Sequence, residues 1–362
     1  AENSMRTTAL YHSPLFLNHE TGRDHAESPE RLRCLSEMIN QPEVAKLFLF
    51  PQFAKASAAT IQLNHTKEHV MEMAATTAHV AAYLDADTRT SAGSYEAALL
   101  AAGAVTDGVD RLISGEIDNG FCLVRPPGHH AERDQSMGFC LFNNIAIGAR
   151  YAIKKHKISR VMIVDWDLHH GNGTQHSFYR QPSVLYCSIH QYPLYPGTGA
   201  LVEYGEGQGT GRTVNLPLSG CHGDAHYARI FETIIQPVAL AYQPQLILVS
   251  CGFDCMAGDP LGAMAVSPGG IAFMTQTMVQ LAGQLCGGKL LFVLVGGYDL
   301  DNLRSGTQAV LTRLLGAPLP SLDGQGLILP DDQDLKRRAT STEAESASID
   351  QAVDFLKHWW PL

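Results

Sequence analysis

The segment RVMIVDWDLHHGNG (160–173) indicates the type of fold, because in it an apolar run passes directly into a cluster of polar side chains. The apolar half is nearly continuous rather than alternating, which is typical of a strand buried on both faces of a parallel sheet. The polar half places Asp165, Asp167 and His169 at the end of that strand. Sites in parallel α/β sheets form at the carboxyl ends of strands, so the stretch predicts a parallel sheet with a site at one edge.

Comparable apolar runs recur along the chain and alternate with stretches of helical periodicity. Further strands are predicted at 119–125, 183–190, 213–218, 245–254 and 289–298. Helices are predicted at 29–39, 94–113, 143–156, 223–241 and 268–285. In the first of these helices, Ser28 is expected to be the N-cap and Pro29 the first helical residue. The alternation predicts a single α/β domain with helices on both faces of the sheet.

The end of the chain has a different composition. We expect the α/β domain to cover residues 5–316 and an extension to cover 317–362. The extension is rich in Pro, Gly and charge up to about residue 342, and an amphipathic stretch at about 343–358 follows. This stretch predicts a terminal helix that packs on the same domain.

Composition excludes several classes of protein. The 362 residues are 45% hydrophobic and 17% charged, and they contain no apolar run long enough to span a membrane. The net charge of −10 disfavours nucleic-acid binding, which needs clustered cations. The eight cysteines form no CxxC pair and no dense disulfide spacing, and no apolar secretory leader is visible. We therefore expect a reduced, cytoplasmic protein with no membrane or nucleic-acid partner.

Polar clusters follow four of the predicted strands. Asp165 ends the strand at 160–167, and Asp254 ends the strand at 245–254. His129 and His130 follow Arg125-Pro-Pro-Gly after the first of the runs, and Tyr298 follows two glycines after the last. Four strand ends are therefore expected to bring carboxylates, imidazoles and a phenol to one edge of the sheet.

This residue set favours a metal site. Asp167 and His169 are two residues apart, so on extended backbone their side chains point to the same side, and Asp254 supplies a third ligand. Two carboxylates and an imidazole suit Zn²⁺ or Fe²⁺ and leave positions open for water and substrate. For an isolated Asp-x-His, a hydrogen-bonded polar strand end would be the better interpretation. The nearby histidines and Tyr298 make the metal site the better interpretation here.

The paired histidines and the tyrosine predict hydrolytic chemistry at this metal. A hydrolytic site needs a group that takes a proton from water and hands one to the leaving group, which His129 and His130 could supply. The alternative is that they are solvated loop residues, but the rigid Pro-Pro-Gly turn favours fixed positions. The Tyr298 phenol could donate to a developing oxyanion, although Gly-Gly-Tyr alone is a weak signal.

At this point the sequence resembles the zinc-dependent histone deacetylase family, which has the arginase–deacetylase fold. The matching segments are RPPGHHAERDQSMGFCLFNN (125–144), VDWDLHHGNGTQ (164–175), SIHQYPLYPGTG (188–199), GFDCMAGDPLG (252–262) and VGGYDL (295–300), with a weaker match at HAESPERL (25–32). The resemblance implies one three-layer α/β/α domain around a central, mostly parallel sheet. It also implies hydrolysis of an acetyl-lysine amide with release of acetate.

The resemblance implies roles for individual residues. The implied zinc ligands are Asp167, His169 and Asp254. His130 matches the general base that later acts as acid, His129 matches its electrostatic partner with Asp165 behind it, and Tyr298 matches the phenol that stabilises the transition state. The implied substrate-binding residues are Gly138, Phe139, Tyr195, Leu261 at the rim and Asp87. A potassium ion is expected beneath the zinc, held by Asp165, Asp167, His169, Ser188 and Ile189.

Two departures from the family pattern carry information. Asn172 stands where class I members have Asp, so the chain looks class II-like. The residue behind His130 is then neutral and supports its basicity less than a carboxylate would. Gly252 stands where binuclear arginase relatives have a further carboxylate, which favours a single catalytic metal.

The substrate class stays open between related alternatives. Leu261 at the rim favours a protein or peptide acetyl-lysine over an acetylpolyamine, the substrate of related amidohydrolases. A non-catalytic acyl-lysine binder is a third reading, disfavoured because a binder does not need His129, His130 and Tyr298 together. A purely structural metal site fits poorly with only three protein ligands.

Overall fold

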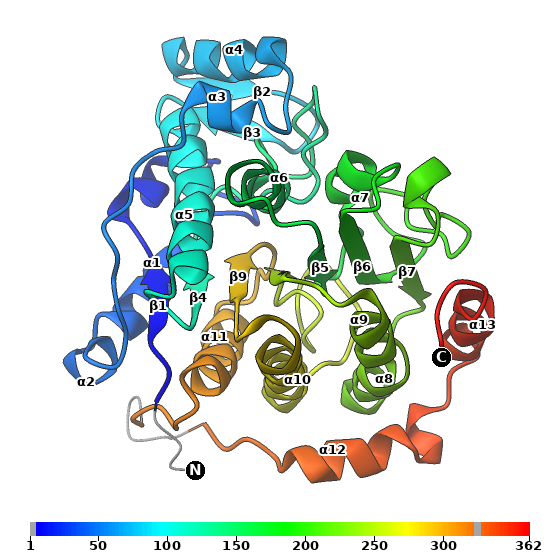
Figure 1. Cartoon of the computed structure of the whole chain (residues 1–362). Coiled ribbons are helices and arrows are strands. Elements are labelled where there is room, and N and C mark those ends of the chain that lie inside the picture. The colour runs from blue at the N-terminus through cyan, green and yellow to red at the C-terminus, as the bar shows by residue number, and fades with distance from the viewer. Residues whose placement is uncertain (1–4, 322–326) are drawn as a thin grey trace.

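The computed structural model describes residues 5–321 and 327–362. Within these residues, seven parallel strands form one sheet in the order β1-β4-β9-β8-β5-β6-β7 (Figure 1). The strands are β1 (Thr8–Tyr11), β4 (Asn119–Cys122), β5 (Val161–Asp165), β6 (Val184–Gln191), β7 (Thr213–Leu218), β8 (Leu246–Cys251) and β9 (Leu290–Leu294). Every residue of β4, β5, β8 and β9 is buried. Burial on both faces explains their unbroken apolar pattern.

All six strands predicted from sequence are present, and the main sheet is entirely parallel. The prediction missed β1, a four-residue strand at one edge of the sheet, which is too short to show a period. It also missed an antiparallel hairpin, β2 (Ala81–Tyr83) and β3 (Arg89–Ser91), outside the main sheet. Short strands carry too few side chains for periodicity to identify them.

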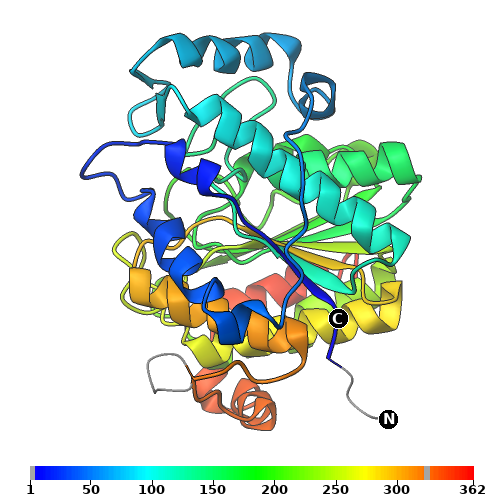
Figure 2. The ribbon, with the colours of Figure 1, turned by 90° about the vertical axis from the view of Figure 1, so that its left-hand side faces the viewer.

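Helices cover both faces of the sheet, which makes three layers (Figures 1 and 2). One layer contains α5 (Ser94–Ser114), α6 (Asn144–His156) and α7 (Asn172–Phe178). The other contains α1 (Glu30–Ile39), α8 (Asp224–Ile230), α9 (Gln236–Tyr242), α10 (Pro268–Cys286) and α11 (Leu300–Leu315). Short helices α2 (Pro42–Ala45), α3 (Ala58–Ile61) and α4 (Lys67–Ala75) lie in the long connection between β1 and α5. The three-layer α/β/α prediction is therefore confirmed.

Capping explains several helix boundaries. The Asn143 side chain accepts from the Ala146 amide to begin α6, and Ser267 accepts from the Gly269 and Gly270 amides to begin α10, with Pro268 as its first residue. At α1 the prediction was off by one residue. The helix begins at Glu30 with Pro29 in the capping position, and no side chain caps it.

Two further differences concern the helices. The predicted helix at 223–241 is interrupted by a π-helical segment, Phe231–Ile235, which separates α8 from α9. The long helix α11 was not predicted, although its N-cap Asp299 accepts from the Asn302 amide. Its sequence mixes polar and apolar residues and follows directly on the Gly-Gly-Tyr motif, so no continuous apolar run marks where the helix begins.

The C-terminal residues pack against the α/β layers. The helix α12 (Asp332–Ala339) contacts α8, and the terminal helix, predicted at 343–358 and found as α13 (Ala347–Leu356), contacts β7. Beyond it, the buried Trp360 indole donates to the Gly211 carbonyl at 3.0 Å. The terminal helix thus packs on the α/β layers, and the division of the chain at residues 316 and 317 stays a prediction.

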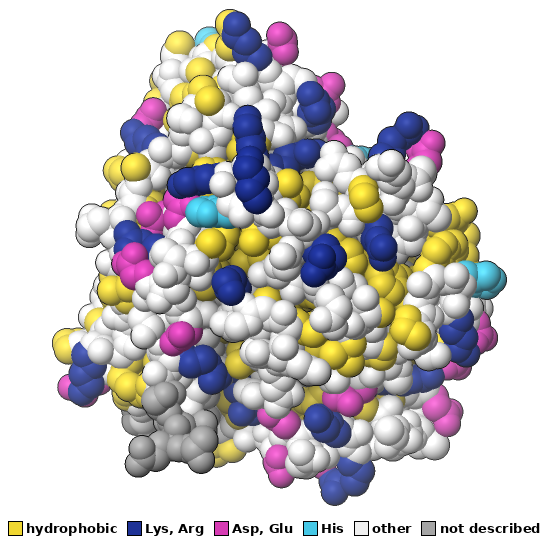
Figure 3. All heavy atoms as spheres, viewed as in Figure 1, with side chains coloured by type: hydrophobic (Ala, Val, Ile, Leu, Met, Phe, Trp, Pro, Cys, Tyr) yellow, Lys and Arg dark blue, Asp and Glu magenta, His cyan; other side chains and the backbone are white. Residues whose placement is uncertain are grey.

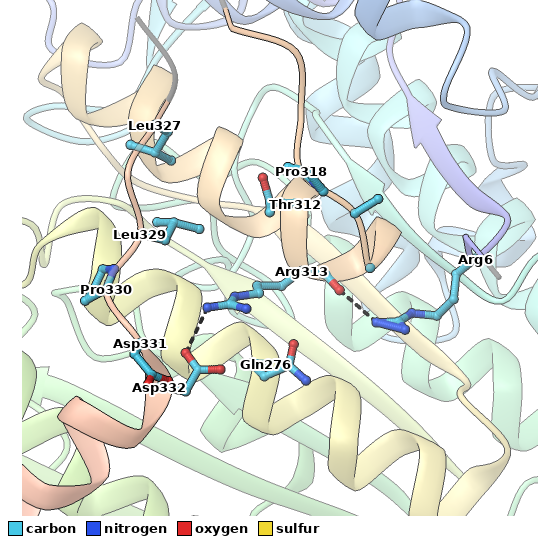
Figure 4. A pocket seen from close by; sticks show the side chains of 12 residues that line it. Arg6, Gln276, Thr312, Arg313, Pro318, Leu327, Leu329, Pro330, Asp331 and Asp332 are labelled. Atoms are coloured by element: carbon cyan, nitrogen blue, oxygen red, sulfur yellow. Dashed lines mark hydrogen bonds and ion pairs between the residues drawn. The ribbon is translucent and has the colours of Figure 1, made fainter. Parts of the chain in front are cut away.

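A pocket of about 600 Å³ is lined by Arg6, by residues of α10 and the end of α11, and by residues 327–332 (Figure 4). The Arg313 guanidinium donates to Asp332 at 2.8 Å across this cavity, and Arg6 donates to the Arg313 carbonyl at 2.9 Å. These contacts join the N-terminus, the end of α11 and the start of α12.

The face of the molecule seen in Figure 1 carries both apolar and charged side chains. Apolar side chains cover much of the middle of this face with several Lys and Arg side chains among them, and Asp and Glu side chains lie mostly toward its margins (Figure 3). Among the described residues, the helices are all too short or too polar to cross a bilayer.

The docking of the terminal helix yields a stability prediction. Trp360→Ala should lower the free energy of unfolding by about 3 kcal/mol, because truncation of a buried Trp leaves a cavity and removes the bond to Gly211. Urea denaturation measures this. Lys357→Ala, at an exposed position of the same segment, is the control and should change stability by under about 0.5 kcal/mol. Equal, small effects of both substitutions would mean that the docked end contributes little.

Candidate active site

The predicted site residues meet because four of the strands that carry them are neighbours. In the sheet order, β4, β9, β8 and β5 lie side by side and run in the same direction. Their carboxyl ends therefore share one edge, and the loops that follow them carry His129 and His130, Tyr298, Asp254, and Asp167 with His169. The prediction that these clusters converge is confirmed.

Asp167, His169 and Asp254 form one compact group of potential metal ligands. One donor atom from each side chain lies within 4.8 Å of the others. The His169 Nδ1 atom is 3.1 Å from Asp254 Oδ2 and 3.4 Å from Asp167 Oδ1. Backbone amides hold both carboxylates: Gly296 N–H donates to Asp167 Oδ2 at 2.7 Å, His169 N–H to Asp167 Oδ1 at 2.9 Å, and Leu168 N–H to Asp254 Oδ1 at 3.0 Å. These bonds fix the orientation of the two carboxylates.

Glycine makes this crowding possible. A Cβ atom at Gly252 would lie 2.3 Å from Asp167 Oδ2, and one at Gly296 would lie 2.4 Å from Asp254 Oδ2. Both distances are shorter than any real contact of a Cβ atom, so the backbone itself forms two walls of the site. The position predicted to distinguish one metal from two is therefore filled by main chain packed against a ligand.

The electrostatics of the group fit a divalent cation. Burial and the neighbouring Asp167 raise the pKa of Asp254 to about 7. Burial opposes the charge on His169, yet the two carboxylates raise its pKa to about 10. Two buried carboxylates that resist a shared negative charge call for a compensating positive one. A cation held by two carboxylates and an imidazole supplies that charge, so these residues fit zinc.

The two histidines beside this group have opposite environments. His129 Nδ1 lies 3.0 Å from Asp165 Oδ2, which also accepts from the Tyr186 hydroxyl at 2.9 Å. Burial alone would lower the pKa of His129, but Asp165 and Asp167 more than offset this and raise it. His130 faces no carboxylate directly. Burial and the neighbouring imidazoles hold the pKa of His130 well below its ordinary value, so it is a neutral base.

The predicted substrate residues surround one cavity of about 280 Å³ above the ligand group. The residues that line it are Asp87, His130, Gly138, Phe139, His169, Leu194, Tyr195, Leu261 and Tyr298. All five substrate positions expected from the resemblance are among them, and Leu194 is an addition. The phenol of Tyr298 is kept protonated because burial raises its pKa well above the ordinary value, so it can serve as a donor.

Local backbone positions two of the channel walls. Gly138 and Phe139 both have positive φ, 55° and 68°, and the Phe139 amide donates to Thr88 Oγ1 at 3.0 Å. A Cβ atom at Gly138 would lie 2.4 Å from the His130 ring, so only glycine fits there. The Phe139 ring lies 5.8 Å from that of Tyr298, and the Tyr195 ring lies 5.2 Å from that of His130.

The predicted potassium site is only partly described by these contacts. Asp165 on β5 and Ser188 on β6 are partners in register, with Ile189 next along β6. The Ser188 hydroxyl lies 2.9 Å from His190 Nδ1. The strand pairing brings Asp165 and Ser188 together, and the ion itself stays a prediction.

Sequence reasoning missed a buried ion-pair cluster behind the site. Glu27 accepts from Arg125 at 2.5 and 2.7 Å and from Arg31 at 2.9 Å, and all three side chains are buried. Arg31 also donates to the carbonyls of Val295 and Gly297, at 2.6 and 2.7 Å, and its guanidinium lies 5.0 Å from the centre of the Tyr298 ring. The cluster therefore supports the loop that carries Tyr298.

Asp259 is a second support that the sequence did not reveal. Its carboxylate accepts from the Tyr298 amide at 2.8 Å and from the Leu261 amide at 2.9 Å. One side chain thus ties the phenol to the rim residue. Glu27 and Arg31 lie in the weakly matching segment 25–32, but nothing in the sequence showed that their charges are buried together.

Comparison with known proteins identifies the family. A model of the histone deacetylase domain matches residues 25–314. Histone deacetylase 15 of Arabidopsis thaliana is 42% identical over 297 residues, which cover 81% of this chain and 53% of that protein. A probable deacetylase of Archaeoglobus fulgidus is 36% identical over 361 residues, which cover 98% of this chain and 99% of that protein. The crystal structure of the HDA15 HD domain superimposes with a TM-score of 0.86 at 36% identity, covering 98% of this chain and 96% of the other.

The fold and the edge site together define an α/β protein of the arginase–deacetylase type. The chain belongs to the histone deacetylase family. It spans about half the length of the first plant and fungal relatives that it matches.

The buried cluster yields a pH prediction. Burial opposes ionisation of Glu27, but Arg125, His19 and Arg31 hold its pKa well below the ordinary 4.5. Because the folded pKa is lowered, Glu27 stabilises the fold above about pH 4.5, and this contribution is lost as pH falls towards the folded pKa. Glu27→Gln should cost about 3–5 kcal/mol at pH 7, since it leaves two buried guanidiniums without their partner.

Urea denaturation at pH 7 and in steps below pH 4.5 measures this. The difference between parent and variant should narrow towards acid. Glu43→Gln, on an exposed ion pair, is the matched control. A constant difference at all pH values would contradict the assigned charge on Glu27.

Proposed function

We propose that the chain is a zinc-dependent hydrolase that removes acetyl groups from N-ε-acetyl-lysine side chains of proteins or peptides. The observation that carries the proposal is the convergence of the three ligand side chains, His130 and Tyr298 at the base of one cavity. A neutral base, a protonated phenol and a cation site around one small volume are the parts that amide hydrolysis requires.

The metal and the protein would divide the work. A zinc ion on Asp167, His169 and Asp254 supplies positive charge that polarises the scissile carbonyl and makes water more acidic. The residues of the chain do the rest. His130 Nε2 takes a proton from the attacking water, and the Tyr298 hydroxyl donates to the oxygen that gains negative charge. His130 then delivers the proton to the amine nitrogen as the C–N bond breaks, so acetate and a free lysine leave.

His129 and Asp165, next to the proposed metal ligands, would support the catalytic groups. His129, whose pKa is raised by its carboxylate partners, keeps positive charge near the developing oxyanion. Asp165 orients His129 through Nδ1 at 3.0 Å. We also propose a potassium ion held by Asp165, Asp167, His169, Ser188 and Ile189, as family members imply.

The shape of the cavity supports an acyl-lysine substrate. Phe139, Leu194, Tyr195 and Leu261 give its wall an apolar character that suits the methylene stem of a lysine. Asp87 also lines the cavity and can accept a peptide N–H. Its neighbour Asp85 accepts the Asp87 and Thr88 amides at 3.0 and 2.6 Å, and burial together with the Asp85 side chain raises the pKa of Asp87. The two carboxylates would also attract a cationic acetylpolyamine, which is the second candidate.

Removal of the phenol tests the catalytic assignment. Tyr298→Phe should lower kcat by about 10²–10³, because the oxyanion loses one preorganised donor. Zinc content should stay at the parental level, since Tyr298 is not among the proposed ligands. Steady-state kinetics on an acetyl-lysine peptide with metal analysis of the same sample measures both. Parental turnover in this variant would remove Tyr298 from the mechanism.

Asp254→Ala is the contrasting variant. It removes a proposed ligand, so metal and activity should disappear together. A fully metallated, active Asp254→Ala protein would contradict the ligand set and leave the assignment of Tyr298 untouched.

The substrate class is tested by direct competition. We expect kcat/KM of the zinc-reconstituted protein to be at least about tenfold higher for an acetyl-lysine peptide than for N-acetylputrescine, because a peptide adds contacts at Asp87 and the rim. The reverse preference would assign the site to acetylpolyamines. Hydrolysis of neither, with zinc bound, would contradict deacetylation and favour the non-catalytic acyl-lysine binder.

A further inference from the structure

Asn172, the residue behind the proposed base His130, could by itself either accept a hydrogen bond from His130 or donate one to it. His130 Nδ1 lies 2.7 Å from Asn172 Oδ1, and both residues are buried. A carboxylate at this position could only accept, so it would force the histidine to donate through Nδ1. An amide carries an acceptor at one end and donors at the other. Turned by 180°, Asn172 would donate to Nδ1 and put the imidazole proton on Nε2, which would abolish the base.

Glu132 removes this ambiguity. Asn172 Nδ2 donates to Glu132 Oε1 at 2.5 Å and to the His130 carbonyl at 3.2 Å. An ionised carboxylate and a carbonyl are acceptors only, so the amide nitrogen must face them. The amide oxygen then faces His130, whose Nδ1 must carry the hydrogen. Nε2 is left free on the side of the cavity that His130 lines.

The position of Glu132 is itself fixed from two sides. It stands two residues after His130, and its amide donates to the Gln135 carbonyl at 2.8 Å. His176 Nδ1 lies 2.8 Å from the same Oε1 atom. Asn172 and His176 are four residues apart on α7, so they share one face of the helix and approach one carboxylate together. The Glu132 side chain is one-fifth exposed, so it lies between the buried Asn172 and the surface.

We propose that Glu132 is the positioning residue of the catalytic base, because through Asn172 it sets which nitrogen of His130 carries the proton. The negative charge that the direct partner lacks is supplied one residue further away, across a polarised amide. The inference rests on the proposed role of His130 as base. It assigns to this chain a three-residue relay, Glu132–Asn172–His130, in place of a carboxylate–histidine pair.

A charge exchange within the relay tests the proposal. Glu132→Gln keeps the shape but allows the two amides to pair in either direction, so kcat should fall about tenfold, less than the roughly 10²–10⁴ that a general base contributes. KM and zinc content should stay unchanged, since neither residue is a proposed ligand. The effect is partial because the His130 carbonyl still favours the native orientation.

Asn172→Asp by itself should also lose activity, because it brings two carboxylates into contact. The double variant, Glu132→Gln with Asn172→Asp, places an acceptor-only group next to His130 and a donor behind it. Its kcat should return to within about threefold of the parent, a non-additive result. Glu206→Gln, in an exposed ion pair with Arg180, is the control and should behave as the parent.

A measurement without turnover separates the relay from the proposed function. The ¹⁵N shifts of the His130 ring in zinc-free protein, assigned by loss of its signals in His130→Gln, report the tautomer. The parent and the double variant should show the Nδ1–H form, and Glu132→Gln a mixture with the Nε2–H form. Parental kcat and tautomer in Glu132→Gln, or multiplied losses in the double variant, would overturn the relay. An inactive parent with the expected tautomers would overturn the proposed function alone.

Discussion

Repulsion between two buried carboxylates, Asp167 and Asp254, is the constraint on which the rest of the site depends. Parallel strands bring both side chains to the same edge of the sheet, where burial raises the pKa of Asp254 to about 7. The groups around the two carboxylates compensate their negative charge. Backbone amides donate to the carboxylate oxygens, His169 lies within 3.4 Å of both carboxylates, and His129 adds positive charge beside Asp167. A bound dication would complete that compensation.

Buried charges are also paired behind the loop that carries Tyr298. Arg31 and Arg125 are buried against one carboxylate, Glu27, and Arg31 also donates to the carbonyls of Val295 and Gly297, which precede Tyr298. An unpaired guanidinium would be unstable in this interior, so segments far apart in the sequence are held together by the need to pair it. The phenol thus takes its position from the beginning of the chain as much as from its own strand.

The sequence predicted the sheet and the meeting of the site motifs because both follow from local patterns. Buried strands have continuous apolar runs, and a parallel sheet aligns their ends without further information. Glu132 and Asn172 lie 40 positions apart, and Glu27 and Arg125 lie 98 apart. Pairs of residues so far apart in the sequence produce no periodicity and no fixed spacing from which their contact could be predicted. The strand β1 and the hairpin β2–β3 escaped because they are short, and the metal, potassium and substrate remain inferences from chemistry.

The glycine walls have a consequence for how such sites change during evolution. Because a Cβ atom at Gly252 would lie 2.3 Å from Asp167, an acidic residue there could not add a ligand without a shift of the loop. On this backbone, a further ligand at position 252 would therefore need a movement of main chain as well as a substitution.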